Sequence, residues 1–161
     1  MVTTLTLCLA VSMSLSLNTQ QTRNVCNYED QIIEQANRYD LEPELIAAVI
    51  YVESSFYPRV VSSANACGLM QVVPRWTGGY ATAGKKYDCE QLKDPKTAII
   101  VGSRILWWTI NKYAKGNKDQ GLCFYNAGIR CKNESYYKKL FYVKKVKRVR
   151  DKIKATLEEE P

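Results

Sequence analysis

The chain has 161 residues, of which 46% are hydrophobic and 24% are charged, and its formal net charge is +7 at pH 7. This length and composition indicate a single globular domain, large enough for one core and one cleft. The charge favours an anionic partner, but it does not choose among nucleic acid, a membrane surface and an acidic polymer. Histidine is absent, which excludes Ser-His and Cys-His nucleophilic catalysis and argues against a catalytic zinc site. We therefore expect neither a metal nor another cofactor.

The N-terminal segment carries no charge before Arg23, and its stretch "LTLCLAVSMSLSL" is short, apolar and interrupted by Ser and Thr. Such a segment is typical of the apolar part of a secretory signal peptide, although no Lys or Arg precedes it. We expect residues 1–22 to be a signal peptide and residues 23–161 to form the domain. The protein would then be exported to the periplasm or cell envelope, and a phage-encoded context would fit equally. The alternative is that the segment forms a buried N-terminal helix.

The cysteines agree with export. Removal of the leader would take Cys8 with it and leave five, none of them in a CxxC pair: Cys26, Cys67, Cys89, Cys123 and Cys131. Scattered single cysteines in an exported chain predict disulfides, each worth about 2–4 kcal/mol. Cys123 and Cys131 bracket a short segment and are expected to pair, and the odd number leaves one thiol free or paired elsewhere. The alternative is that all are buried and reduced.

Hydrophobic periodicity predicts a mainly α fold with no internal repeat or linker. A first helix is expected over residues 27–39, with Asn27 as its cap. A second begins near Pro43 and ends near Glu53. Residues 54–93 are punctuated by Ser, Pro and Gly, so we expect loops and a small hairpin there.

Three further helices are expected in the C-terminal half. A long helix begins at Asp94 and Pro95, and a short helix over residues 118–127 ends at Gly128. The last helix is expected from Tyr136 to Leu157. Its apolar residues recur at helical spacing, so one face packs while the other carries Lys and Arg. That basic face is either simply solvated or attracted to the anionic wall or to membrane phosphates.

Glu53 stands in the apolar and aromatic stretch "AVIYVESSFYP", close to the end of the second helix. Burial among apolar side chains and the negative end of the helix dipole both disfavour the carboxylate, so both raise its pKa. A carboxylic acid that keeps its proton near neutral pH can donate it to the leaving oxygen of a glycoside. The alternative is a solvated glutamate at a helix end.

Two later motifs favour the first interpretation. After Glu53-Ser54 come "GLMQ" (Gly68 to Gln71) with Pro74, and then "YNAG" (Tyr125 to Gly128). In this order and spacing the sequence resembles the lytic transglycosylases of the soluble-lytic-transglycosylase, goose-type lysozyme-like family. The resemblance extends from about Gln31 to Lys154 and includes the late segment "YVKKV" that begins at Tyr142. The segment "GGYATAGKKYDCEQ" matches no pattern of the family.

The resemblance implies an α+β lysozyme-like fold, mainly α, whose cleft binds peptidoglycan glycan strands. It implies cleavage of the β-1,4 bond from N-acetylmuramic acid to N-acetylglucosamine, with Glu53 as acid and then base and a 1,6-anhydro end as product. It further implies that the substrate is contacted by Ser54, Met70, Gln71, Tyr125, Asn126 and Tyr142. A structural role is an alternative for each of these, above all for Met70 and Asn126. Trp76, Trp107 and Trp108 are expected to serve packing.

Two alternatives stay open. One is a hydrolytic muramidase in which Asp88, Glu90 or Asp94 helps to position a water. The other is a non-catalytic wall- or nucleic-acid-binding protein that keeps the fold and uses the basic tail. A nucleic-acid partner is not expected, because no groove-entering element or base-reading pattern is found. We expect a monomer.

Overall fold

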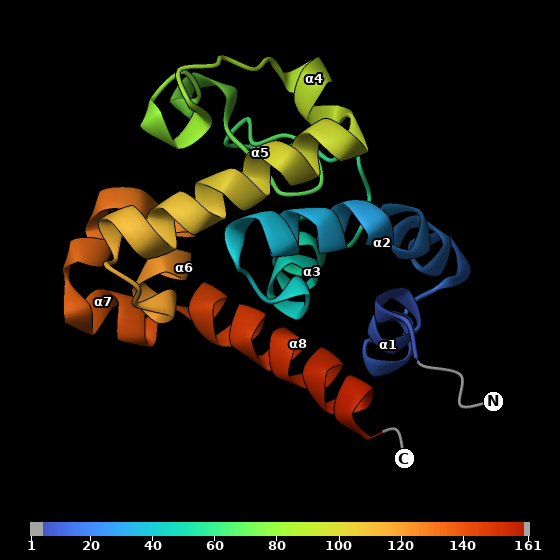
Figure 1. Ribbon diagram of the computed structural model, residues 1–161. Helices are drawn as coiled ribbons and strands as arrows, with labels where there is room; N and C mark the ends of the chain where they lie inside the picture. The colour runs from blue at the N-terminus through green and yellow to red at the C-terminus, as the bar shows by residue number, and fades with distance from the viewer. Residues whose placement is uncertain (1–4, 160–161) are drawn as a thin grey trace.

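The computed structural model describes residues 5–159, which fold into helices packed around one main core (Figure 1). The mainly α class expected from the sequence is confirmed. The α-helices are α1 (Leu7–Ser14), α2 (Thr19–Tyr39), α3 (Pro43–Ser54), α4 (Cys89–Lys93), α5 (Pro95–Trp108), α6 (Lys118–Ala127), α7 (Glu134–Lys139) and α8 (Phe141–Glu158). None of the helices in this described range combines the length and the apolar character needed to cross a bilayer.

Helix α3 lies at the centre of the molecule, with α2, α5 and α8 around it (Figure 1). Six consecutive residues, from Leu45 to Ile50, are buried, so this helix is covered on all sides. Such burial on every side makes α3 a core helix. Pro43 stands in its first turn, as its fixed φ favours.

In the intact chain the N-terminal segment is a helix packed on the core, and its removal as a signal peptide stays a prediction. Residues 7–14 form helix α1, whose Leu7, Cys8, Ala10 and Val11 are buried against the core, and Cys8 is bridged to Cys26 of α2. Residues 1–4 of the expected leader lie outside the described residues. The expectation of an unpaired cysteine is wrong for the intact chain, because it assumed that Cys8 is absent. All six cysteines pair, and the expected bridge between Cys123 and Cys131 is confirmed.

Helix α2 begins eight residues before the expected start. Asn18, not Asn27, is its cap, and the Asn18 side chain and Gln21 form a reciprocal capping box. The predicted start of this helix is wrong because the uncharged residues before Arg23 were assigned to a leader. Asn27 is an exposed residue within the helix.

The long helix begins at Pro95 as expected, and the side chain of its cap Asp94 accepts a hydrogen bond from the Thr97 backbone N–H. After Trp108 the helix widens into a π-helical turn, η3 (Thr109–Tyr113). Such a turn changes the direction in which the following side chains project.

The last expected helix is in fact two helices, α7 and α8, separated by Leu140 in extended conformation (φ −62°, ψ 121°). Leucine gives no signal for a break, so the pattern could not predict it. The break starts α8 at Phe141 and thereby places Tyr142 in its first turn.

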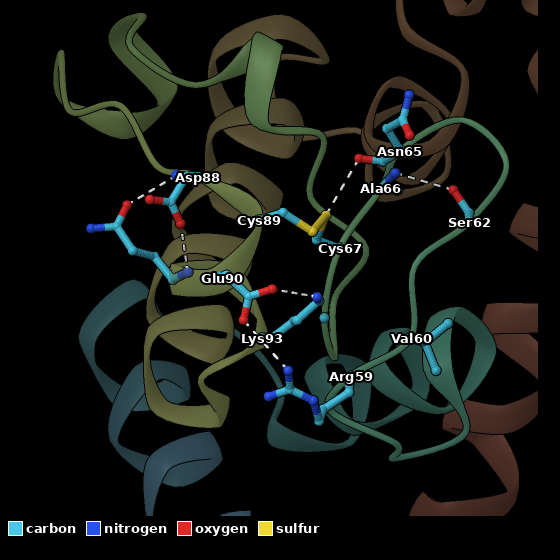
Figure 2. Close-up of a disulfide and its surroundings, with 12 residues drawn as sticks. Arg59, Val60, Ser62, Asn65, Ala66, Cys67, Asp88, Cys89, Glu90 and Lys93 are labelled. Atoms are coloured by element: carbon cyan, nitrogen blue, oxygen red, sulfur yellow. Dashed lines mark hydrogen bonds and ion pairs between the residues drawn. A yellow bond between two sulfur atoms is a disulfide. The ribbon is translucent and has the colours of Figure 1, made fainter.

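Between α3 and α5 the chain forms loops, the short turns η1 (Pro74–Trp76) and η2 (Tyr80–Thr82), and α4. Instead of a full hairpin it has two isolated antiparallel bridges, Val61–Cys67 and Cys67–Val72. Figure 2 shows how the Cys67–Cys89 disulfide fastens this loop to the start of α4. Beside the disulfide, Glu90 pairs with Arg59 and Lys93. These exposed pairs add little stability, whereas the disulfide restricts the loop covalently.

Candidate active site

Glu53 occupies the last turn of α3, where the chain leaves the core. The two residues after the end of α3, Ser55 and Phe56, both have positive φ (52° and 65°), and this reverses the chain. Two α2 side chains hold the reversed segment: the buried Asn24 amide donates to the Phe56 carbonyl, and Gln21 donates to that of Ser55. Helix α2 thus fixes the segment that follows Glu53, and the Glu53 side chain is only partly exposed.

Burial is the main influence on Glu53 and raises its pKa from 4.5 to about 7. Two smaller influences oppose this rise. The Tyr142 hydroxyl donates a hydrogen bond of 2.7 Å to Glu53 Oε1, and the charge of Lys145 also favours the carboxylate. The second oxygen, Oε2, has no hydrogen-bond partner among the described residues and is the atom available for proton transfer.

Tyr125 lies close enough to Glu53 to feel its charge and is held by the loop that carries the GLMQ motif. Its hydroxyl donates to the Met70 carbonyl at 2.7 Å. Burial, and then the charge of Glu53, raise the pKa of both Tyr125 and Tyr142 well above 10. Both phenols therefore stay protonated and act as hydrogen-bond donors.

The GLMQ loop is packed so closely against α4 and α5 that two of the glycines in contact there have no space for a side chain. Gly68 has φ +79°, and a Cβ there would lie 1.8 Å from the Leu92 carbonyl oxygen. At Gly102 of α5 a Cβ would lie 2.4 Å from Met70 Sδ. Glycine at both positions lets Met70 pack closely against α5, so the Met70 carbonyl is in place to accept from Tyr125.

Gln71 ends the motif in left-handed conformation, with φ 50°. Its amide group donates to the carbonyls of Val60 and Gly68, both at 3.0 Å. Within residues 5–159 its amide oxygen has no partner, so Gln71 can still accept a hydrogen bond from a bound molecule.

The structure thus brings Glu53, Tyr125 and Tyr142 together, from three helices. Two expected contact residues are turned inward. The Ser54 hydroxyl is buried and donates to the Ile50 carbonyl, and the Met70 side chain is fully buried against α5, with its sulfur 3.9 Å from the Ser103 hydroxyl.

Asn126 is exposed at the end of α6. Lys145, which the sequence analysis did not single out, belongs to this site through its charge on Glu53. Its place one turn after Tyr142 in a helix could have indicated it.

The three other acids considered from the sequence are exposed and already engaged. Asp88 and Asp94 are exposed caps of α4 and α5 and accept from the backbone of Gln91 and Thr97. Glu90 is exposed and paired with two cations. Among the described residues, no carboxylate is hydrogen-bonded to Glu53.

Curated relatives share this region of the chain. This chain is 38% identical over 109 residues to the membrane-bound lytic murein transglycosylase E of Buchnera aphidicola. The match covers 64% of this chain and 49% of that protein. The chain is 40% identical over 93 residues to the membrane-bound lytic murein transglycosylase C of Haemophilus influenzae, covering 55% of this chain and 26% of that protein. The chain thus spans half or less of the length of these relatives.

Solved structures show the same fold. The 70 kDa soluble lytic transglycosylase of Escherichia coli matches with a TM-score of 0.69 at 20% identity, covering 96% of this chain and 29% of that one. An inactive mutant of lytic transglycosylase Slt from Pseudomonas aeruginosa matches with a TM-score of 0.70 at 19% identity, covering 95% of this chain and 28% of that one. The model of the transglycosylase SLT domain matches residues 30–145, which contain all the residues of the site. The chain belongs to the transglycosylase SLT domain family.

Proposed function

We propose that the protein is a peptidoglycan lytic transglycosylase with Glu53 as its single acid and base. The observation that carries this proposal is the Glu53 carboxyl, whose pKa is raised to about 7 by burial while a tyrosine holds one of its oxygens. A group with a pKa near the working pH can both give and accept a proton with little loss of driving force. Family membership and the names of the relatives support the substrate and reaction class.

The reaction begins with proton transfer from Glu53 Oε2 to the glycosidic oxygen. The bond between that oxygen and C1 of N-acetylmuramic acid breaks, and N-acetylglucosamine leaves with the proton. The substrate's own 2-acetamido carbonyl stabilises the positive charge that develops at C1, which is one of the known departures from the two-carboxylate scheme. The ionised Glu53 next takes the proton of the muramyl C6 hydroxyl, and the C6 oxygen bonds to C1 to close the 1,6-anhydro ring. No water is consumed, and the acid is regenerated.

Tyr142 orients Glu53, and Tyr125 fixes the GLMQ loop beside it. We assign substrate contact to the free amide oxygen of Gln71, to the exposed Asn126 and to the ring faces of the two tyrosines. Ser54 and Met70 are left out, because their polar and apolar groups are already engaged inside the fold. They support the site without touching the substrate.

The engagement of the three other acids considered from the sequence favours transglycosylation over hydrolysis. A hydrolase needs a held water, commonly with a base to activate it, whereas the C6 hydroxyl is tethered next to the reacting carbon. The three exposed carboxylates considered for that role are occupied as caps or in ion pairs. The hydrolytic muramidase therefore has less support from this site.

Mass spectrometry of the muropeptides released from purified peptidoglycan tests the proposal. Fragments one water lighter than hydrolysis products, without a reducing muramic end, are expected. Glu53→Gln should reduce their formation by at least about 10²–10⁴-fold, the usual contribution of general acid–base catalysis. Glu34→Gln, at an exposed position of α2, is the matched control and should keep full activity. Mostly reducing ends would instead identify a muramidase, and full activity of Glu53→Gln would overturn the assigned acid.

The setting we propose is the cell envelope, where peptidoglycan lies. The basic face of α8 supports an attraction to anionic wall polymers or membrane phosphates, because Lys144, Arg148 and Lys152 repeat every fourth residue and are exposed. Such an attraction should weaken with added salt. Binding of the protein, which we propose to be a monomer, to anionic vesicles or wall fragments at low and high ionic strength tests this attraction separately.

A further inference from the structure

Two aromatic rings lie on the surface within and just before residues 78–91, the segment that matches no family pattern. Trp76 and Tyr80 are 71% and 85% exposed, contrary to the expectation that Trp76 serves packing. Exposed large apolar side chains that gather on a surface mark a binding site more often than isolated ones do. Because residues 78–91 match no pattern of the family, the exposed rings need an explanation of their own.

Tyr80 does not stand alone. Its ring is stacked on Trp108 (centroids 6.2 Å apart, planes at 6°), Trp108 contacts Trp107 (6.1 Å), and Trp107 contacts Tyr39 (5.9 Å). These four rings, which we call the aromatic strip, come from η2, α5 and the end of α2. This row of contacting rings runs from the partly buried Tyr39, Trp107 and Trp108 to the exposed Tyr80. Its outermost member, Tyr80, is held flat by the ring beneath it.

The loop that carries Tyr80 is held firmly in place. Arg104 of α5 donates from Nε to the Ala81 carbonyl at 3.0 Å. The Thr82 hydroxyl accepts from the Gly78 N–H at 2.8 Å, and the Thr77 hydroxyl accepts from the Tyr87 N–H at 2.9 Å. The exposed ring of Tyr80 is therefore preorganised, so little conformational entropy is lost when a ligand covers it.

The strip is connected to the proposed catalytic site through α5. Met70, which holds Tyr125, packs against Gly102 of α5. Trp108 is six residues further along the same helix, about 9 Å at the usual rise. Trp76 follows Gln71 by five residues in the same loop. A chain bound across Glu53 that continues along α5 would reach the strip within a few sugar units.

The chemistry of the strip selects among ligands. A pyranose ring has an apolar C–H face and a polar edge, which suits flat aromatic faces flanked by hydrogen-bonding groups. Cations lie among the rings: Arg75 is 4.9 Å from the Trp76 centroid and Lys112 is 5.4 Å from that of Trp107. These charges oppose insertion into hydrocarbon, but they suit a solvated glycan that carries acidic groups.

Resting on the proposed function, we propose that the aromatic strip, together with Trp76, is an additional saccharide subsite. It binds the distal sugars of the glycan strand whose scissile bond lies at Glu53. The subsite strengthens the binding of long strands and contributes little to short ones. The loop that carries Tyr80 thus makes the enzyme selective for chain length, because only a strand long enough to reach Tyr80 gains its contacts.

The test uses the Glu53→Gln protein, which should bind strands without cleaving them. Calorimetry measures its affinity for long, peptide-free glycan strands and for a tetrasaccharide of the same sugars. Trp76→Ala combined with Tyr80→Ala should weaken binding of the long strands about tenfold, equivalent to about 1.4 kcal/mol. The tetrasaccharide should lose far less. Tyr80→Phe keeps the ring and should restore its part of the affinity.

Tyr113→Ala is the matched control, because Tyr113 is 59% exposed but contacts Phe124 outside the strip. It should change neither affinity. Equal affinities for long strands with and without the two rings would overturn the subsite. A fall in melting temperature that parallels the loss of binding would also overturn the subsite. So would equal losses of affinity for the long strands and the tetrasaccharide, because either result would indicate a structural role for the two rings. Preferential capture of lipid vesicles or nucleic acid over glycan would also overturn it.

Failure of the proposed function gives a different result. In that case the protein with Glu53 intact would release no anhydro or reducing fragments from peptidoglycan, whatever the state of the strip. Active enzyme whose turnover on long strands is unchanged by the double substitution would leave the function in place and remove only the subsite. The two hypotheses can therefore fail independently.

Discussion

The Tyr142 hydroxyl lies 2.7 Å from Glu53 Oε1, although 89 residues separate them in the chain. The contact joins the last turn of the most buried helix to the first turn of α8. It depends on the break at Leu140, since a continuous helix from Tyr136 would direct Tyr142 elsewhere. Proton affinity at Glu53 thus depends on where a distant helix begins.

Tyr142→Phe should raise the pKa of Glu53 further above 7. The hydroxyl hydrogen bond stabilises the charged form, so its removal leaves burial less opposed. The limb of the pH–activity profile that reports loss of the catalytic proton should move to higher pH, and the optimum with it. The profile of kcat/KM for muropeptide release measures this shift. Tyr136→Phe, in α7, is the control and should leave the profile in place; a profile unmoved by Tyr142→Phe would contradict the assigned contact.

Stability should fall as the pH rises from about 4.5 to about 7. The native Glu53 carboxyl keeps its proton up to about pH 7, whereas the unfolded chain releases it near 4.5, so the native state binds more protons in this interval. Glu53→Gln cannot ionise and should be more stable than the parent above pH 7, by roughly 1–3 kcal/mol. Urea unfolding at pH 4, 6 and 8 measures the difference. The free energy of unfolding of the exposed Glu34→Gln variant should match that of the parent at all three pH values. If Glu53→Gln also matched the parent throughout, the assigned burial of Glu53 would be contradicted.

Gly102→Ala should reduce both stability and activity. The added Cβ would lie 2.4 Å from Met70 Sδ and 2.6 Å from Met70 Cβ, so Met70 must move, and its carbonyl with it. Overpacking of this kind costs about 1–3 kcal/mol, and the displaced carbonyl no longer fixes Tyr125. Gly79→Ala is the matched control, because nothing lies within 4 Å of its Cβ position. Thermal melts and muropeptide release check both variants; equal behaviour would show that Met70 adapts freely.

The oxidised full-length protein should contain no free thiol, and six thiols after reduction. A chain that lacks residues 1–22 loses Cys8 and should show one free thiol at Cys26. Thiol titration under denaturing conditions, read together with the intact mass, therefore detects removal of the leader. Reduction should also lower stability, by about 3 kcal/mol for the bridge from Cys67 to Cys89, whose ends are 22 residues apart. Six free thiols in protein from an oxidising compartment would contradict the disulfides.

Local signals allowed much of the fold to be predicted from the sequence. Asp94 and Pro95 fixed the start of α5, and Pro43 fixed that of α3, because caps and first-turn prolines act within one turn. Glu53 was found because an acid in an apolar stretch is itself a local signal. The GLMQ and YNAG motifs then gave its neighbours.

What the sequence could not predict depends on contacts between distant segments. The inward orientation of Ser54 and Met70 follows from packing against the core and α5. The exposure of Trp76 depends on a loop whose shape is set by its own hydrogen bonds. The pairing of Cys8 needed α1 and α2 to lie side by side, which no pattern within either helix encodes.

The disulfides join the cysteines in consecutive pairs: Cys8 with Cys26, Cys67 with Cys89, and Cys123 with Cys131. Six cysteines permit 15 complete pairings, and this is the one in which every cysteine finds its partner next along the chain. A chain oxidised as it emerges N-terminus first would form each native bridge before the next pair arrives. Such a chain reaches its final connectivity without an isomerase having to undo an earlier bond.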